Sequence, residues 1–179
     1  MLTLSFDVGS KNLSYCKMNS ETHQIIDWNV CAIPTNGTNV QKVVEFLYET
    51  FQQDLLLGLD TVLVEKQPPR NVKMRLIETI LLVFFATRHV KTVLSYSAKH
   101  KLGSAGKQTR GKKNYSLRKK MSIVMCGAYL EKIDDPAHTA MFQKSKKKDD
   151  LSDALLQYLS YIKYDLDSLQ DKIIDLNIG

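Results

Sequence analysis

The order of short apolar runs limits the fold of this 179-residue chain more than any other feature of its sequence. Three strand-like runs, at residues 2–8, 13–18 and 24–30, follow one another through short turns, which favours an antiparallel meander. Two further strand-like runs, at residues 61–65 and 90–96, each follow a helical pattern, and strands joined through helices pair in parallel. We therefore expect an α/β fold with one mixed five-stranded sheet, flanked by helices on both faces.

Helical spacing of apolar residues predicts the segments that cover this sheet. The pattern indicates helices at residues 40–54 and 72–88 before the last strand, and at about 117–128 and 151–162 after it. Residues 99–120 are rich in Lys, Arg and Gly. A solvated flexible loop and a nucleic-acid contact explain that composition equally well.

The predicted helix at residues 72–88 is apolar on more than one face. A helix that packs against one side of a sheet needs only one apolar stripe, so the extra face should also be buried. Two explanations remain open at this point. Neighbouring helices of the same chain could cover the face, or a second copy could cover it across a two-fold axis.

Carboxylates occur at the ends of two predicted strands and at the start of the last helix. Asp7 and Glu65 each lie where an apolar run ends, and functional groups gather at the carboxyl ends of parallel strands. Asp150 and Asp153 are three residues apart, so they share one helical face. The ordinary alternatives are that Asp7 caps a turn and that Asp149 and Asp150 complement the helix dipole.

Four carboxylates brought together would repel one another strongly unless cations lay among them. Mg²⁺ prefers oxygen ligands, and two such ions stabilise both the attacking and the leaving oxygen of a phosphoryl displacement. The chain as a whole carries a net charge of +6, which suits a polyanionic partner. These features predict that the acids hold metal ions while lysines hold a phosphate backbone.

Several other classes of protein fit the sequence poorly. The three cysteines are scattered and odd in number, which indicates thiols in a reducing compartment, and the four histidines lack zinc-ligand spacing. The longest apolar run, at residues 77–86, is interrupted by Glu78 and Thr79 and is too short to span a bilayer. No signal peptide precedes the first strand-like run. We expect a soluble intracellular protein.

Four motifs follow one another along the chain: LSFDVGSKN at residues 4–12, LVEKQPPR at 63–70, YSLRKK at 115–120 and KDDLSDA at 148–154. Together, in this order and spacing, they resemble the motifs of viral Holliday junction resolvases of the poxvirus type. That group is RuvC-like and also resembles the fungal mitochondrial resolvases. The resemblance covers residues 2–164.

The resemblance implies a ribonuclease H-like fold, with a nuclease domain at residues 1–164 and a tail at 165–179 of unknown role. It implies a homodimer that cuts four-way DNA junctions by paired symmetric nicks in viral or organellar DNA recombination. Two Mg²⁺ ions per active site, replaceable by Mn²⁺, would be the cofactors. Host-cell cytoplasm is the expected location if the chain is poxvirus-like, with the nucleus or mitochondrion as alternatives.

The resemblance also assigns roles to individual residues. It implies that the metal ligands are Asp7, Glu65, Asp150 and Asp153, with Asp149 as the alternative to Asp150. Lys119 would face the scissile phosphate as a fifth catalytic residue, with Lys120 as its alternative. Gln67 and Arg70 would be positioning residues near the active-site strand, with surface or turn roles as the equal alternative. The residues expected to contact DNA are Lys11, Arg70, Lys112, Lys113, Arg118, Lys120, Lys146 and Lys147.

Three other functions compete with this interpretation. The Asp7-Val-Gly-Ser turn also resembles the first phosphate loop of sugar kinases and actin-like ATPases, but those need two such domains, and this chain is too short. A non-catalytic DNA-binding module would explain the basic segments and leave Asp7 and Glu65 without a role. A ribonuclease H-like nuclease that acts on another substrate, such as RNA in hybrids, would use the same metal chemistry.

Overall fold

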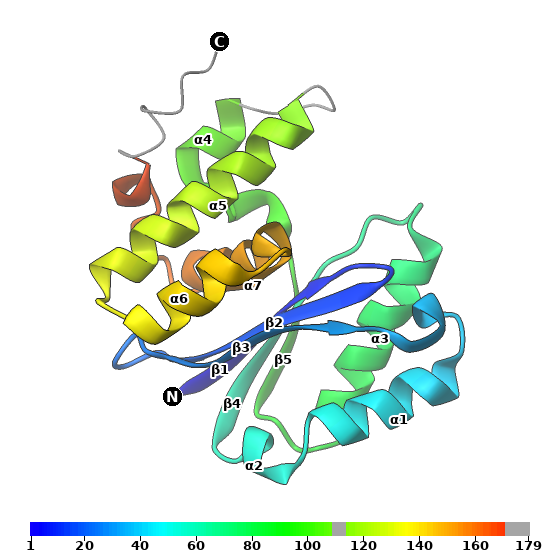
Figure 1. Cartoon of the computed structure of the whole chain (residues 1–179). Helices are drawn as coiled ribbons and strands as arrows, with labels where there is room; N and C mark the ends of the chain where they lie inside the picture. Colours follow the sequence, from blue (N-terminus) through cyan, green and yellow to red (C-terminus); the bar gives the residue numbers. More distant parts are fainter. Residues whose placement is uncertain (109–113, 171–179) are drawn as a thin grey trace.

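The computed structural model describes residues 1–108 and 114–170, and its centre is one five-stranded sheet (Figure 1). The spatial order is β3-β2-β1-β4-β5, with antiparallel pairing from β1 to β2 to β3 and parallel pairing from β1 to β4 to β5. The expected mixed sheet is thus confirmed. The strand bounds are β1 (Leu2–Val8), β2 (Asn12–Asn19), β3 (Ile25–Ala32), β4 (Leu59–Glu65) and β5 (Thr92–Tyr96).

Helices cover both faces of this sheet, as expected. One face packs against α1 (Val40–Thr50) and α3 (Val72–Ala86), and the other packs against α5 (Tyr115–Lys132) and α7 (Lys148–Tyr161) (Figure 1). Because side chains alternate along a strand, the neighbours Tyr15 and Cys16 of β2 enter opposite core clusters.

The first predicted helix is shorter than its apolar spacing indicated. Instead of continuing to residue 54, α1 ends at Thr50, and a separate short helix, α2 (Gln53–Leu56), follows. Phe51 between them has non-helical φ and ψ angles of −107° and 69°. Its ring lies 5.3 Å from that of Phe6 and 5.7 Å from that of Phe85, so the chain leaves the helix where Phe51 enters the core.

The basic segment is not simply a solvated loop. A 3₁₀ turn (Ala98–His100) and the short helix α4 (Gly103–Gln108) follow β5, and α5 starts at Tyr115. Lys112 and Lys113 lie outside the described residues. After α5 and α6 (Pro136–Lys144), the chain forms α7 and a last 3₁₀ turn (Asp167–Leu169), in which Leu169 is buried. None of the helices in the described part of the chain is long and apolar enough to cross a membrane.

Polar side chains of the sheet donate hydrogen bonds to the backbone at the beginning of α7. The Ser14 hydroxyl of β2 donates to the carbonyl oxygen of Asp150 at 2.6 Å, and the indole N–H of Trp28 on β3 donates to that of Leu151 at 3.1 Å. These bonds fix where the helix crosses the sheet, and therefore where its acidic side chains lie.

Candidate active site

The fold places the two strand-end carboxylates at one edge of the sheet. Asp7 lies near the end of β1, Glu65 is the last residue of β4, and these strands are parallel neighbours. Gly9 allows the tight turn after Asp7, because a Cβ atom there would lie 2.7 Å from the carbonyl oxygen of Asn12. Only 14% of the Asp7 side chain and 16% of the Glu65 side chain are exposed.

Lys101, which belongs to none of the four sequence motifs, lies between these carboxylates. Its Nζ atom is 3.0 Å from Asp7 Oδ1 and 3.0 Å from Glu65 Oε1. Burial alone would lower the pKa of Lys101, but the adjacent carboxylates raise it above its usual value, so the ammonium remains charged. In the sequence, Lys101 is one of many basic residues between 99 and 120, and composition could not distinguish it from the exposed ones.

Asp153 on α7 is the third carboxylate of this group. Burial raises the pKa of Asp153; Lys101 partly offsets this effect and Glu65 adds to it. Burial also raises the pKa of Asp7, whereas for Glu65 the effect of burial is outweighed by Lys101 and by hydrogen bonds, which lower its pKa. One lysine thus faces three acidic side chains, and this excess of carboxylates favours binding of a further cation.

Gln67 bonds to the second carboxylate oxygen of Glu65, and the buried Glu78 of α3 in turn bonds to Gln67. The Gln67 side-chain amide donates to Glu65 Oε2 at 2.9 Å, and the Gln67 backbone N–H donates to Glu78 Oε2 at 3.0 Å. The Ser95 hydroxyl of β5 donates to Glu78 Oε1 at 2.5 Å. Both carboxylate oxygens of Glu65 therefore have fixed partners.

A pocket of about 170 Å³ lies beside this group, and a second lysine, Lys119, is among the residues that line it. The Lys119 ammonium on α5 contacts the Asp149 carboxylate, and this hydrogen bond raises the pKa of Lys119. Positive and negative side chains thus line one small pocket, which suits a phosphate group together with cations. Its lining residues are Glu65, Lys101, Leu102, Tyr115, Arg118, Lys119, Ser122 and Asp153.

The two other acids of α7 have different surroundings. Asp149 holds Lys119, whereas one oxygen of Asp150 accepts a hydrogen bond of 3.3 Å from the Asn12 amide and lies 3.8 Å from Lys147 Nζ. Asp150 is not among the residues that line the pocket, although its charge adds to the raised pKa of Asp153. The structure therefore links Asp7 and Glu65 through Lys101, places Asp153 in the same pocket lining as Glu65 and Lys101, and places Asp150 close enough to Asp153 to affect its pKa.

A divalent metal ion would find suitable donor atoms in this group, since all of them are carboxylate oxygens. Within residues 1–108 and 114–170, however, no three His, Cys, Asp or Glu side chains are arranged to hold a metal ion. At Asp7 and Glu65, the ammonium group of Lys101 lies within 3.0 Å of an oxygen of each carboxylate. These carboxylates are suitable ligands for a hard cation. The Lys101 ammonium already pairs with two of them.

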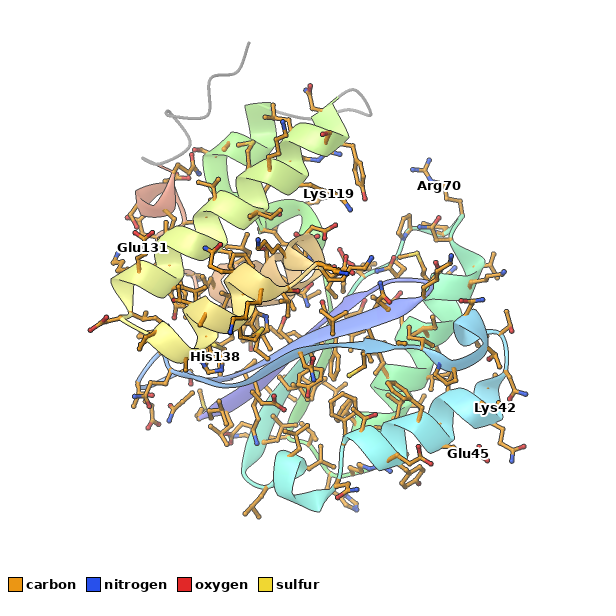
Figure 2. All side chains as sticks on the ribbon, in the orientation of Figure 1. Lys42, Glu45, Arg70, Lys119, Glu131 and His138 are labelled. Carbon is orange, nitrogen blue, oxygen red and sulfur yellow. The ribbon has the colours of Figure 1, made fainter. Side chains whose placement is uncertain are left out.

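Most of the basic residues expected to contact DNA are exposed. Figure 2 shows Lys119 on α5 and Arg70, which follows β4, at the same edge of the molecule in that view. Arg118, in contrast, is half-buried and lines the pocket. The exposed members of the set within the described residues are Lys11, Arg70, Lys120, Lys146 and Lys147.

Comparisons with known proteins agree with this architecture. A model of the family described as Poxvirus A22 protein matches residues 1–167. The complex of fowlpox virus resolvase with Holliday junction DNA is 24% identical, with a TM-score of 0.62, over 94% of this chain and 99% of that chain. A second structure of the fowlpox virus Holliday junction resolvase is 19% identical, with a TM-score of 0.58, over 91% and 99%.

A more distant similarity supports the same fold. RuvC of Thermus thermophilus, in complex with a Holliday junction substrate, is 15% identical, with a TM-score of 0.55, over 91% of this chain and 95% of that chain. No curated protein matches the sequence. The structural similarities confirm the expected ribonuclease H-like fold.

Proposed function

This chain belongs to the poxvirus A22 protein family, and from that premise we propose that it is an endonuclease that resolves four-way DNA junctions. The observation that carries the proposal is the group formed by Asp7, Glu65 and Asp153 with Lys101, beside the pocket that Lys119 enters. The resolvase of fowlpox virus and RuvC, which share the fold, are both known in complex with Holliday junctions. Phosphodiester hydrolysis at paired, symmetric positions would separate the joined duplexes.

Some of these side chains would bind metal ions or phosphate, and others would hold the first group in position. Asp7, Glu65, Asp153 and the adjacent Asp150 would hold two Mg²⁺ or Mn²⁺ ions, which would activate a water as the nucleophile and stabilise charge on the phosphate. Lys119, which lines the pocket and pairs with Asp149, would donate to the scissile phosphate there, and Gln67 holds the Glu65 carboxylate in place through its hydrogen bond. The exposed lysines beyond the pocket neutralise the DNA backbone.

A comparison of substrates tests the function. The protein is incubated with a labelled four-way junction, a linear duplex of the same sequence and an RNA–DNA hybrid, with Mg²⁺ or with a chelator. We expect nicks in the junction only, placed symmetrically, and only with Mg²⁺. Preferential cleavage of the hybrid would instead identify a ribonuclease, and junction binding without cleavage would identify a DNA-binding module.

Lys119→Ala should slow cleavage much more than it weakens junction binding. A cation directed at charge that develops on the phosphate acts mainly in the transition state, and its loss should cost about 100-fold in rate. Lys42→Ala is the control, because Lys42 is exposed on α1 and belongs neither to the pocket nor to the residues expected to contact DNA. Single-turnover cleavage and binding in chelator are measured for both. Equal losses of rate and affinity in Lys119→Ala would reduce Lys119 to an ordinary phosphate contact.

We also propose that the protein is a homodimer, because α3 keeps apolar side chains exposed on the surface of this chain. Val83 is 57% exposed and Leu76 is 36% exposed, although α1 and the strands β4 and β5 pack against other faces of the helix. Beside Val83, a surface groove of about 280 Å³ runs between α1 and α3. A junction has two equivalent strands to cut, and a two-fold dimer would offer one active site to each.

Val83→Lys should convert the dimer into a monomer. A charge at Val83 would be desolvated in the interface, whereas in the monomer it would remain in water. Val83 is a better test position than Ile80 or Phe84, since those two are buried in the core of their own chain and a charge there would unfold it. Sedimentation equilibrium at micromolar concentration measures the result, with Lys73→Ala on the exposed start of α3 as control. A monomeric wild type that nicks both strands in one encounter would contradict the proposal.

The remaining assignments follow the same premise. The nuclease domain would span residues 1–164, although Leu166 and Leu169 also pack in the core, so the folded chain continues at least that far. The protein would act in the cytoplasm of a virus-infected cell. Localisation of a tagged copy during infection tests this assignment.

A further inference from the structure

Gln157 of α7 is a fully buried polar residue that has no part in the chemistry described above. Its side-chain nitrogen lies 3.0 Å from the carbonyl oxygen of Phe6, 3.1 Å from the hydroxyl of Ser5 and 3.4 Å from the carbonyl oxygen of Leu63. Ser5 and Phe6 belong to β1, and Leu63 belongs to β4. A single amide therefore joins α7 to two neighbouring strands.

These attachment points lie close to the three acids of the site. The carbonyl on β1 immediately precedes Asp7, and the carbonyl on β4 is two residues before Glu65. On α7, Gln157 lies four residues after Asp153, which places both side chains on the same face of the helix. The amide thus connects the three elements that carry Asp7, Glu65 and Asp153. It contacts the two strands one and two residues before their acids, and it lies about one helical turn after Asp153 on α7.

The orientation of the amide follows from its neighbours. Two of its three partners are carbonyl oxygens, which only accept hydrogen bonds, so the NH₂ group must face the sheet. The oxygen of the Gln157 side chain then has no hydrogen-bond partner within the described residues. A buried acceptor without a partner lowers stability, and this cost offsets part of what the contacts of the NH₂ group contribute, so packing alone does not account for an amide at this position.

We propose that Gln157 is a positioning residue, which sets the Asp153 carboxylate relative to those of Asp7 and Glu65 so that together they receive divalent ions. The inference rests on the proposed metal-dependent nuclease function. Metal sites tolerate displacements of only a fraction of an ångström in their ligands, and residues that hold the ligands affect metal affinity without touching the metal. In this protein the ligands come from different elements, so the link between those elements has that role.

Gln157→Met tests the inference, because methionine has a similar length and volume but donates no hydrogen bond. We expect junction cleavage at limiting Mg²⁺ to fall about 10- to 100-fold and the half-saturating Mg²⁺ concentration to rise. The affinity for Mn²⁺ measured by calorimetry should fall in parallel. Junction binding in chelator should stay close to the wild-type value, and the melting temperature should fall by only a few degrees, since the loss of these hydrogen bonds is partly offset by the removal of the unpartnered side-chain oxygen.

Tyr158→Phe is the matched control. Tyr158 is the next residue of α7, it is fully buried, and its hydroxyl also has no hydrogen-bond partner within the described residues. Its removal should leave cleavage, Mg²⁺ dependence and metal affinity unchanged. If Gln157→Met does not fold, Gln157→Asn gives the same comparison, since it keeps the amide and shortens its reach by one methylene group.

Two results would overturn the inference. One is a folded Gln157 variant with wild-type Mg²⁺ dependence and wild-type Mn²⁺ affinity. The other is a loss of cleavage that follows the loss of thermal stability while the Mg²⁺ midpoint stays constant, which is the behaviour of a structural residue. A wild-type protein that cuts no junction would instead contradict the proposed function, and the Mn²⁺ calorimetry would still test Gln157.

Discussion

Glu65→Gln and Asp153→Asn should each abolish junction cleavage while junction binding persists or becomes tighter. Each change removes a carboxylate expected to bind metal, and metal-ion catalysis supplies several kcal/mol of transition-state stabilisation, so the rate should fall about a thousand-fold or more. Binding should survive because each substitution also removes a negative charge that repels the phosphate backbone. Single-turnover cleavage with Mg²⁺ and gel-shift affinity in chelator measure the two effects.

The two variants should differ in stability, and this difference tests the electrostatics of the site. Burial raises the pKa of Asp153, so Asn resembles the protonated form and should leave the melting temperature unchanged or higher. The pKa of Glu65 is lowered and its carboxylate pairs with Lys101, so Gln loses a charged hydrogen bond and should lower the melting temperature. Glu49→Gln, at an exposed position on α1, is the control for both assays. A variant that cut at the wild-type rate under limiting Mg²⁺ would show that its acid is not a ligand.

Lys101→Met should destabilise the metal-free protein by about 3–5 kcal/mol at neutral pH, because it leaves the buried carboxylates of Asp7 and Glu65 without their cation. For a domain of this size, that loss corresponds to a fall in melting temperature of roughly 10 °C. Mn²⁺ should then raise the melting temperature of Lys101→Met more than that of the wild type, since the ion compensates the same charges. Thermal unfolding in chelator and with Mn²⁺ measures both effects.

Lys99→Met is the matched control for Lys101→Met. Lys99 lies two residues earlier and is exposed, so its replacement should leave the melting temperature unchanged under both conditions. Equal melting temperatures for wild type and Lys101→Met in chelator would contradict the view that Lys101 compensates the buried acids. An equal response to Mn²⁺ in both proteins would show that the metal and the lysine do not share these carboxylates.

The sheet could be predicted from the sequence alone, because strand direction follows from local features. Short turns between the first three apolar runs leave only antiparallel pairing, and intervening helices make the later strands parallel. That topology also brought Asp7 and Glu65 to neighbouring strand ends, so two members of the site were predictable without coordinates. The motif order further indicated the poxvirus-type family, which the match over residues 1–167 confirms.

The pairing of the charged residues could not be predicted, because it depends on how distant segments of the chain pack together. Lys101 and the exposed Lys99 belong to the same basic segment, and their roles differ because one side chain turns inward to Asp7 and Glu65. Helical spacing placed Asp150 and Asp153 on one face, but it could not show that Asp150 bonds to Asn12 while Asp153 faces the lysine. Periodicity reports which face of an element is buried. Which residue each acid of α7 contacts depends on how this helix crosses the sheet. That crossing is fixed by long-range hydrogen bonds, such as the one from Ser14 to the backbone of Asp150.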